Sequence, residues 1–103
     1  MRKPWTKSLR VEQILKKFGA DLRDARLRRE LSQEQIAERF NTTTSTIMKM
    51  EKGDPKTAIQ IYALALHMYG KIDALEMLID RTNDPLSLDL TDRKLPKRIR
   101  KSK

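Results

Sequence analysis

The sequence predicts an all-α fold, a compact bundle of about five helices with basic arms at its N- and C-terminal ends. Three observations predict it. Apolar residues recur every three or four positions along most of the chain, which is helical spacing and not the alternation of strands. Capping and breaking residues divide this pattern into short segments. The length of 103 residues indicates one domain, and its 24 Leu, Ile, Val and Phe residues are enough for a small core.

The first predicted helical region covers residues 8–30. We expect one or two helical turns over residues 8–17 and a helix over residues 18–30. Gly19 leaves two alternatives open, because it can divide the two segments or mark a point of close packing. The apolar stripe that predicts the region consists of Val11, Ile14, Leu15, Phe18, Leu22 and Ala25.

Two short helices joined by a tight turn follow over residues 32–51. Ser32 is a good N-cap for the first, because its hydroxyl can accept a free N–H of the first turn. Asn41 ends that helix, since Asn tolerates the left-handed backbone of a tight turn. Thr43 can cap the second helix, and Gly53 followed by a proline ends it. The residues expected to face the core are Ile36, Ala37, Phe40, Ile47 and Met50.

Two further helices are predicted over residues 57–69 and 72–79, with Gly70 between them. Three leucines then alternate with polar residues over 86–90, which indicates a short strand or an apolar stretch that packs on its own domain. The chain therefore divides into a basic, partly helical N-terminal arm (1–17), a helical domain (18–80) and a C-terminal segment (81–103) that ends in a basic tail.

The net charge of +9 is concentrated at the two ends of the chain. Residues 1–18 contain six basic residues and one acidic residue, and residues 93–103 contain seven basic residues and no acidic one. Residues 19–92 contain ten basic and thirteen acidic residues. Basic terminal arms commonly hold a phosphate backbone. Charge alone leaves open a nucleic acid, a membrane surface, an acidic protein, or tails that only aid solubility.

Composition also excludes several classes of protein. The chain has no Cys, which excludes a disulfide framework, a thiolate metal site and a Cys nucleophile, and which fits a cytoplasmic protein. The longest apolar stretch, residues 61–69, is far shorter than the ~20 residues that span a bilayer. With one His and no Gly-rich loop, the sequence predicts neither an enzyme, nor a cofactor, nor a metal site.

The helix predicted to follow Thr43 has an unusual outward face. Small hydroxyl side chains let a helix backbone approach the major groove closely, and hydroxyls can bond base edges or phosphates. The alternative is an ordinary Thr-rich surface at the start of a helix, although Thr is a mediocre helix former. The outward residues are Thr43, Thr44, Ser45, Thr46, Met48, Lys49 and Lys52.

Residues 31–53, LSQEQIAERFNTTTSTIMKMEKG, resemble the helix-turn-helix of the Xre, or phage-repressor-like, family. Residues 18–31 are similar to the first helix of that family, so the resemblance covers about 18–79 and implies a lambda-repressor-like helix-turn-helix DNA-binding domain. This chain has Asn41 where the family usually has Gly, and Met48 where Ser is frequent. The matching anchors are Leu31, Ser32, Gln33, Ile36, Ala37, Thr46, Ile47, Glu51 and Gly53.

The resemblance also implies roles for individual residues. Arg26 and Glu51 match a pair that forms a buried ion bridge between the first and third helices, and loss of one partner of such a pair costs ~3–5 kcal/mol. The residues implied as base contacts are Gln33, Thr43, Thr44, Ser45 and Lys49. The residues expected to contact phosphates are Ser32, Thr46, Lys52, Arg28, Lys97, Arg98 and Arg100.

The turn over residues 51–55, the apolar helix after it and the closing RKLPKRIRK resemble the HipB-like subgroup, whose members accompany HipA-type kinase toxins. This resemblance implies a cytoplasmic homodimer that represses its own operon at a palindromic operator and binds the toxin or a subunit of the toxin system. Some such antitoxins dimerise through a strand, which residues 86–90 could form. Two alternatives stay open: an antitoxin whose main role is to hold or inhibit a kinase toxin, and a phage-type repressor with no toxin.

Overall fold

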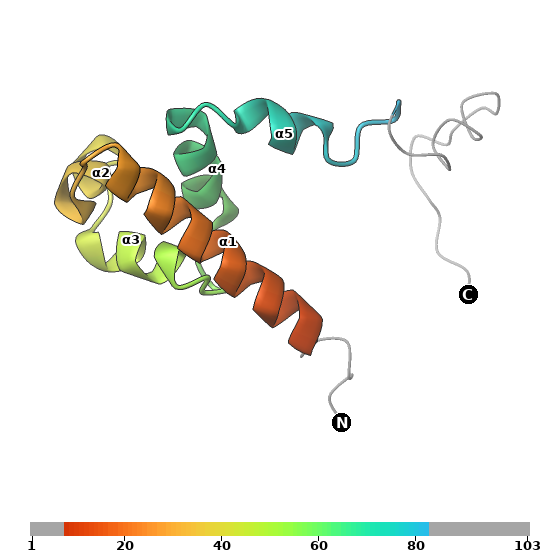
Figure 1. The fold of residues 1–103 in the computed structure, drawn as a ribbon, viewed down its shortest axis with the longest axis horizontal. Helices are drawn as coiled ribbons and strands as arrows, with labels where there is room; N and C mark the ends of the chain where they lie inside the picture. Colours follow the sequence, from red (N-terminus) through yellow and green to blue (C-terminus); the bar gives the residue numbers. More distant parts are fainter. Residues whose placement is uncertain (1–7, 83–103) are drawn as a thin grey trace, which may run out of the picture. The chain divides into compact units, whose positions relative to one another are not determined.

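The computed structural model describes residues 8–82, which form five α-helices (Figure 1). The predicted all-α fold of about five helices is therefore confirmed, and no strand occurs between residues 8 and 82. The predicted strand at 86–90 and the basic tail lie outside the described residues. The helices are α1 (Leu9–Arg28), α2 (Gln33–Arg39), α3 (Thr44–Glu51), α4 (Ile59–Met68) and α5 (Ile72–Met77).

Helix α1 is a single helix of 20 residues that runs without a break through Gly19. Its N-cap is Ser8, whose hydroxyl accepts the amide of Val11 at 3.2 Å. A Cβ added at Gly19 would lie 2.6 Å from the backbone nitrogen of Gly53. Gly19 therefore marks close packing of α1 against the end of α3. The helix is also continuous across residues 17 and 18, where the sequence predicts the border between arm and domain.

The first four helices end in the same way, with one residue in the left-handed conformation directly after the C-cap. These residues are Glu30, Asn41, Gly53 and Gly70, with φ between 55° and 77°. After α1, the amide of Leu31 bonds the carbonyl of Arg26, and equivalent six-to-one bonds close α2, α3 and α4. This arrangement is the Schellman motif, which satisfies carbonyls at the helix end. The predicted helix end at residue 30 is wrong by two residues, because Glu30 takes the left-handed position.

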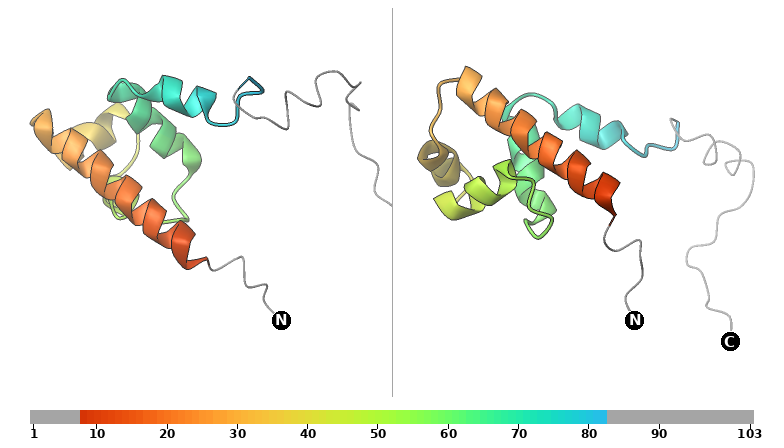
Figure 2. Two further views of the ribbon diagram at one scale, coloured as in Figure 1. Left: turned by 45° about the vertical axis from the view of Figure 1, so that its right-hand side comes forward. Right: turned by 60° about the horizontal axis from the view of Figure 1, so that its bottom comes forward.

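The core of residues 8–72 lies where α3 packs against α1, α2 and α4. Figures 1 and 2 show α1 lying across α3 and α4, with α2 beside its C-terminal end. Phe18 of α1 stacks on Tyr62 of α4, with ring centroids 5.4 Å apart. The fully or largely buried apolar residues are Leu22, Ile36, Ala37, Ile47, Met50, Tyr62, Ala65 and Tyr69. Burial of this small core is the main favourable term in folding.

The first turns of α1 extend beyond the other helices of this unit (Figure 2). Val11 and Ile14 are therefore 54% and 49% exposed, although they belong to the same apolar stripe as the buried Leu22. The stripe thus continues past the region where α1 has a partner.

Residues 73–82 belong to a second compact unit. Helix α5 ends at Met77, two residues earlier than predicted, and none of its residues is buried. After it, the carboxylate of Asp80 accepts the amide of Thr82 at 2.8 Å. In the part of the chain described here, no helix is long and apolar enough to cross a membrane.

Candidate nucleic-acid interface

Helix α3 has one buried face and one face directed to solvent. Ile47 and Met50 are fully buried, and Glu51 is 6% exposed. The opposite face exposes Ser45, Met48, Lys49 and Lys52, with the half-buried Thr44 and Thr46 on its flanks. The predicted outward residues thus lie on one side of a helix whose other side is held in the core. Such a helix can enter the major groove without loss of its own packing.

The start of α3 is capped by Thr43. Its hydroxyl accepts the amide of Thr46 at 3.2 Å and lies 3.0 Å from the hydroxyl of Thr46. The predicted base contact and the predicted phosphate contact are therefore joined to each other in this structure. Thr43 has a structural role as the N-cap, and each hydroxyl keeps either its proton or a lone pair for a ligand.

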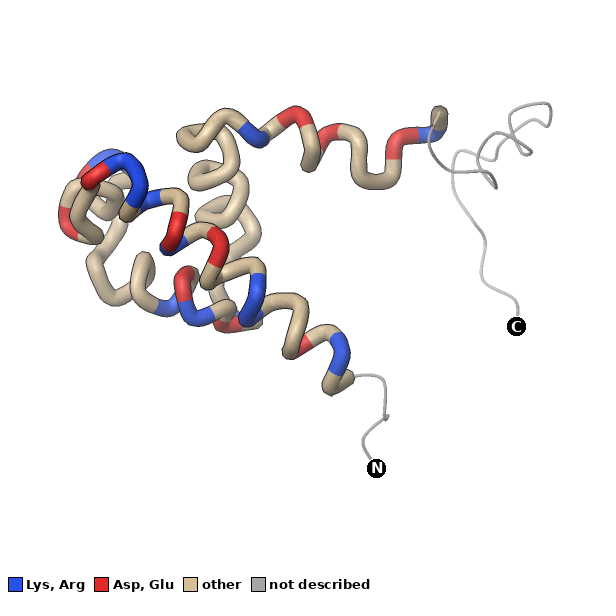
Figure 3. The backbone as a smooth tube through the Cα atoms, in the orientation of Figure 1, with Lys and Arg blue, Asp and Glu red and all other residues tan. Residues whose placement is uncertain are grey.

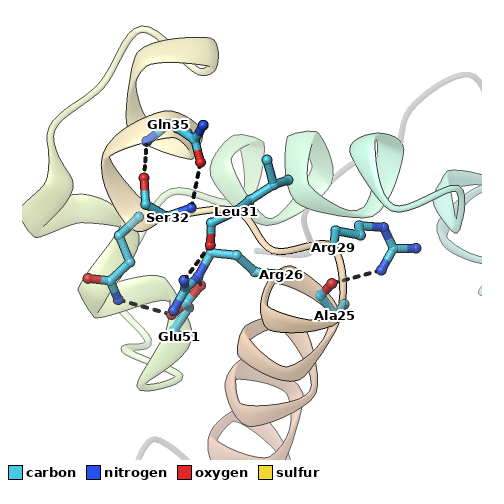
Figure 4. A network of polar contacts seen from close by, with 8 residues as sticks. Ala25, Arg26, Arg29, Leu31, Ser32, Gln35 and Glu51 are labelled. Carbon is cyan, nitrogen blue, oxygen red and sulfur yellow. Dashed lines mark hydrogen bonds and ion pairs between the residues drawn. The ribbon is translucent and has the colours of Figure 1, made fainter.

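The ion pair between Arg26 and Glu51 is present, and it joins α1 to α3 (Figure 4). The Arg26 Nε donates to Glu51 Oε2 at 2.7 Å, and Nη2 donates to Oε1 at 3.1 Å. Arg26 Nη1 also donates to the carbonyl of Leu31 at 2.8 Å. Both side chains are buried, and the hydrogen bond with Glu51 raises the pKa of Arg26 above its ordinary value. The burial of two charges is tolerated because the bidentate geometry compensates for lost hydration.

Gln33 contacts this ion pair. The sequence predicted Gln33 as a DNA contact but did not predict its bond to Glu51. Its Nε2 donates to Glu51 Oε1 at 3.0 Å. The bond ties the start of α2 to the end of α3, so the three helices of the motif meet at one carboxylate. The second N–H and the carbonyl oxygen of Gln33 remain for a ligand.

Ser32 and Gln35 form a capping box at the start of α2 (Figure 4). The Ser32 hydroxyl accepts the amide of Gln35 at 3.1 Å, and Gln35 Oε1 accepts the amide of Ser32 at 2.8 Å. This reciprocal pair satisfies two amides that the helix leaves free. Ser32, a predicted phosphate contact, therefore also fixes the start of α2.

The basic residues predicted on the helices differ in their surroundings. Arg28 forms an exposed ion pair with Asp24 at 2.8 Å, which is a weak interaction that a phosphate can replace. Within residues 8–82, neither Lys49 nor Lys52 has an acidic partner. These two exposed lysines, one on α3 and one at its C-cap, are therefore available to an anionic ligand. Lys97, Arg98 and Arg100 lie outside the described residues.

A cavity of about 430 Å³ lies beside the outward face of α3, and the sequence did not predict it. It brings Lys56, from the turn before α4, next to Lys49 and Thr46. The amide of Lys56 donates to the Asp54 carboxylate at 2.8 Å, which shapes this turn. The one sequence feature that could have predicted this cavity is a lysine shortly after the end of α3. The cavity is lined by Thr42, Thr46, Lys49, Asp54, Lys56, Thr57, Ala58 and Ile61.

Charge on the described part is nearly balanced, with 13 basic and 11 acidic residues between positions 8 and 82. Figure 3 shows both signs along α1, whereas α4 carries neither. In these same residues, no group of three or more His, Asp or Glu side chains could hold a metal ion. The site therefore offers short polar side chains and a few lysines on a helix whose other face is buried.

Comparison with known proteins agrees with this geometry. A family described as "Helix-turn-helix domain" matches residues 17–75, which is more than half of the chain and includes the C-terminal part of α1 and all of α2, α3 and α4. No curated protein and no solved structure matched the chain in the corresponding comparisons. With the arrangement of α2, its tight turn and α3, the match shows that this chain belongs to the helix-turn-helix domain family, which points to a DNA-binding regulator.

Proposed function

We propose that this protein is a sequence-specific transcriptional repressor that acts in the cytoplasm as a homodimer and has no catalytic activity. In this proposal α3 lies in the major groove, and the two copies read the half-sites of a palindromic operator about one helical turn apart. The observation that carries the proposal is the outward face of α3. It combines small hydroxyl side chains with two lysines that lack acidic partners within residues 8–82.

The network under this face supports the same proposal. Arg26, Gln33 and Glu51 hold α1, α2 and α3 together through bonds of 2.7 to 3.1 Å. A recognition helix needs such support, because contacts to bases lose their energy when the helix can shift. A second helix inserted by the partner copy doubles the number of bases that are read.

Selection from a random duplex library with the full chain tests DNA recognition directly. We expect enrichment of a palindrome with half-sites centred about ten base pairs apart. Footprinting of the region upstream of the gene should protect the same sequence. Enrichment of no sequence, with uniform and salt-sensitive binding to all duplexes, would contradict the proposal.

Phosphate contacts are tested by the salt dependence of binding. Lys52→Ala should weaken binding to all duplexes alike and lower the salt slope by about one unit, because one phosphate contact is lost. Deletion of residues 97–103, which removes Lys97, Arg98 and Arg100, should lower the slope further. If the tail deletion changes sequence preference while the slope is constant, these residues do not act as a phosphate arm.

We further propose a HipA-type kinase toxin, or another subunit of its system, as the protein partner. This proposal rests on the resemblance of the turn at 51–55 and of the C-terminal sequence to HipB-like proteins. Co-purification with the products of neighbouring genes is the test, and the absence of a HipA-like kinase gene beside this one would leave a phage-type repressor. If a variant with Thr44→Ala and Lys49→Ala still suppresses growth arrest by the toxin, the main role is to hold the toxin.

A further inference from the structure

Met48 is an exposed apolar side chain on the outward face of α3. It is 42% exposed, and the nearest exposed large apolar residues along the chain lie on other helices, Leu27 on α1 (46%) and Ile59 on α4 (74%). The other apolar residues of α3, Ile47 and Met50, are fully buried. The core of the domain therefore does not require an apolar residue at position 48.

The neighbours of Met48 are residues that the proposed function places against bases. Thr44 lies one turn earlier on the same side of α3, and Ser45 lies three residues earlier. Lys49 follows directly and is exposed. An apolar group at this point meets the same stretch of groove as these polar side chains.

The major groove offers one apolar feature for such a side chain. Each thymine presents a C5-methyl group there, and the other three bases present only donors, acceptors and ring edges. A methionine is long, unbranched and flexible, so its thioether can adapt to the position of a methyl group. Contact between the two removes apolar surface of both from water.

We propose that Met48 contacts the C5-methyl group of a thymine and thereby selects thymine at one position of each half-site. The inference rests on the proposed function, since it requires α3 to lie in the major groove. It goes further by assigning a base preference to a side chain where Ser is frequent in the family that the sequence resembles. Ser45 and Lys49 would then form hydrogen bonds with the bases, whereas Met48 would form an apolar contact.

The test compares thymine with deoxyuridine, which lacks only the C5-methyl group. The full chain first selects a duplex from a random library, and each thymine of that duplex is then replaced in turn by deoxyuridine. For the unmodified protein, we expect a loss of affinity of about fourfold at one thymine of each half-site, the effect of one buried methyl group. At the other thymines we expect smaller changes.

Variants of Met48 assign that loss to the side chain. Met48→Ser should bind the thymine and deoxyuridine duplexes equally at the sensitive position, whereas Met48→Leu should keep a loss because it is apolar. Leu27→Ser is a matched control, because Leu27 is 46% exposed but lies on α1; it should keep the full fourfold loss. Thermal unfolding midpoints of all variants check that they fold.

Two results would overturn the inference while the proposed function stands. One is a selected duplex whose affinity is unchanged by deoxyuridine at every thymine. The other is a loss that persists in Met48→Ser, which would assign the methyl contact to a different residue. If no duplex is enriched at all, the proposed function itself fails.

Discussion

The inner and outer faces of α3 differ in chemistry although both come from the same eight residues. The inner face is buried and presents Ile47, Met50 and Glu51 to the core. The outer face presents Ser45, Met48 and Lys49 to solvent. Substitutions on the inner face should therefore change the free energy of unfolding, and substitutions on the outer face should change DNA binding alone. Glu51 on the inner face and Lys49 on the outer face allow a direct test of this separation.

Loss of the Glu51 carboxylate should have the largest effect. Glu51→Ala leaves the Arg26 guanidinium buried without its partner and removes the bond to Gln33. We expect the free energy of unfolding to fall by ~3–5 kcal/mol in urea titrations. The double variant Arg26→Met with Glu51→Leu should recover part of this loss, since it buries no charge. An unchanged unfolding free energy in Glu51→Ala would show that the pair is not structural.

Loss of the Lys49 side chain should change binding without changing stability. Lys49→Ala should cost about 1–3 kcal/mol of binding free energy and relax base preference at one position of the operator. Its unfolding free energy should stay within about 0.5 kcal/mol of the original. The control is Lys17→Ala on α1, which removes the same charge from an exposed pair with Asp21. Equal losses of binding free energy in the two variants would indicate that Lys49 contributes only its positive charge.

Replacement of Glu30 should stabilise the scaffold and leave the outer face of α3 unchanged. Glu30 has a φ of 56°, which an L side chain adopts at a cost that Gly avoids. We expect Glu30→Gly to raise the free energy of unfolding by about 1 kcal/mol. Glu34→Gly in the first turn of α2 is the matched control and should lower it, because Gly is a poor helix former. A loss of stability in Glu30→Gly would contradict the Schellman assignment.

Substitution of Tyr69 should have the smallest effect on the free energy of unfolding, and chiefly at alkaline pH. Burial raises the pKa of its phenol, and also that of Tyr62, so the folded state favours the neutral form. The resulting stabilisation is complete below the ordinary pKa of about 10 and is lost as pH rises through the raised value. The Tyr69 hydroxyl has no hydrogen-bond partner among residues 8–82, so Tyr69→Phe should change stability by less than ~1 kcal/mol at pH 7.

Unfolding in urea at pH 7 and pH 11 measures this difference. The original protein should lose more stability between the two values than Tyr69→Phe, which has one buried phenol fewer. Equal losses would indicate that Tyr69 ionises without cost in the folded state. DNA binding at pH 7 should be the same for both proteins.

Helix starts and ends were the features that local sequence predicted best. Ser32 and Thr43 cap α2 and α3 as expected, and Asn41, Gly53 and Gly70 take left-handed positions after their helices. These features depend on a few consecutive residues, so the side-chain and backbone preferences of those residues are enough to predict them. The left-handed conformation of Glu30 was not predicted, because Glu has no preference for the left-handed region.

The sequence by itself thus determined the all-α class, the position of the helix-turn-helix and the outward set of hydroxyls on α3, because helical periodicity and capping are local. Only the tertiary structure decided that Gly19 meets the backbone of Gly53, that Gln33 binds Glu51 and that Lys56 joins Lys49 at one cavity. These contacts join residues from different elements. Their existence depends on how helices cross, and crossing is set by the packing of the whole core and not by any one segment.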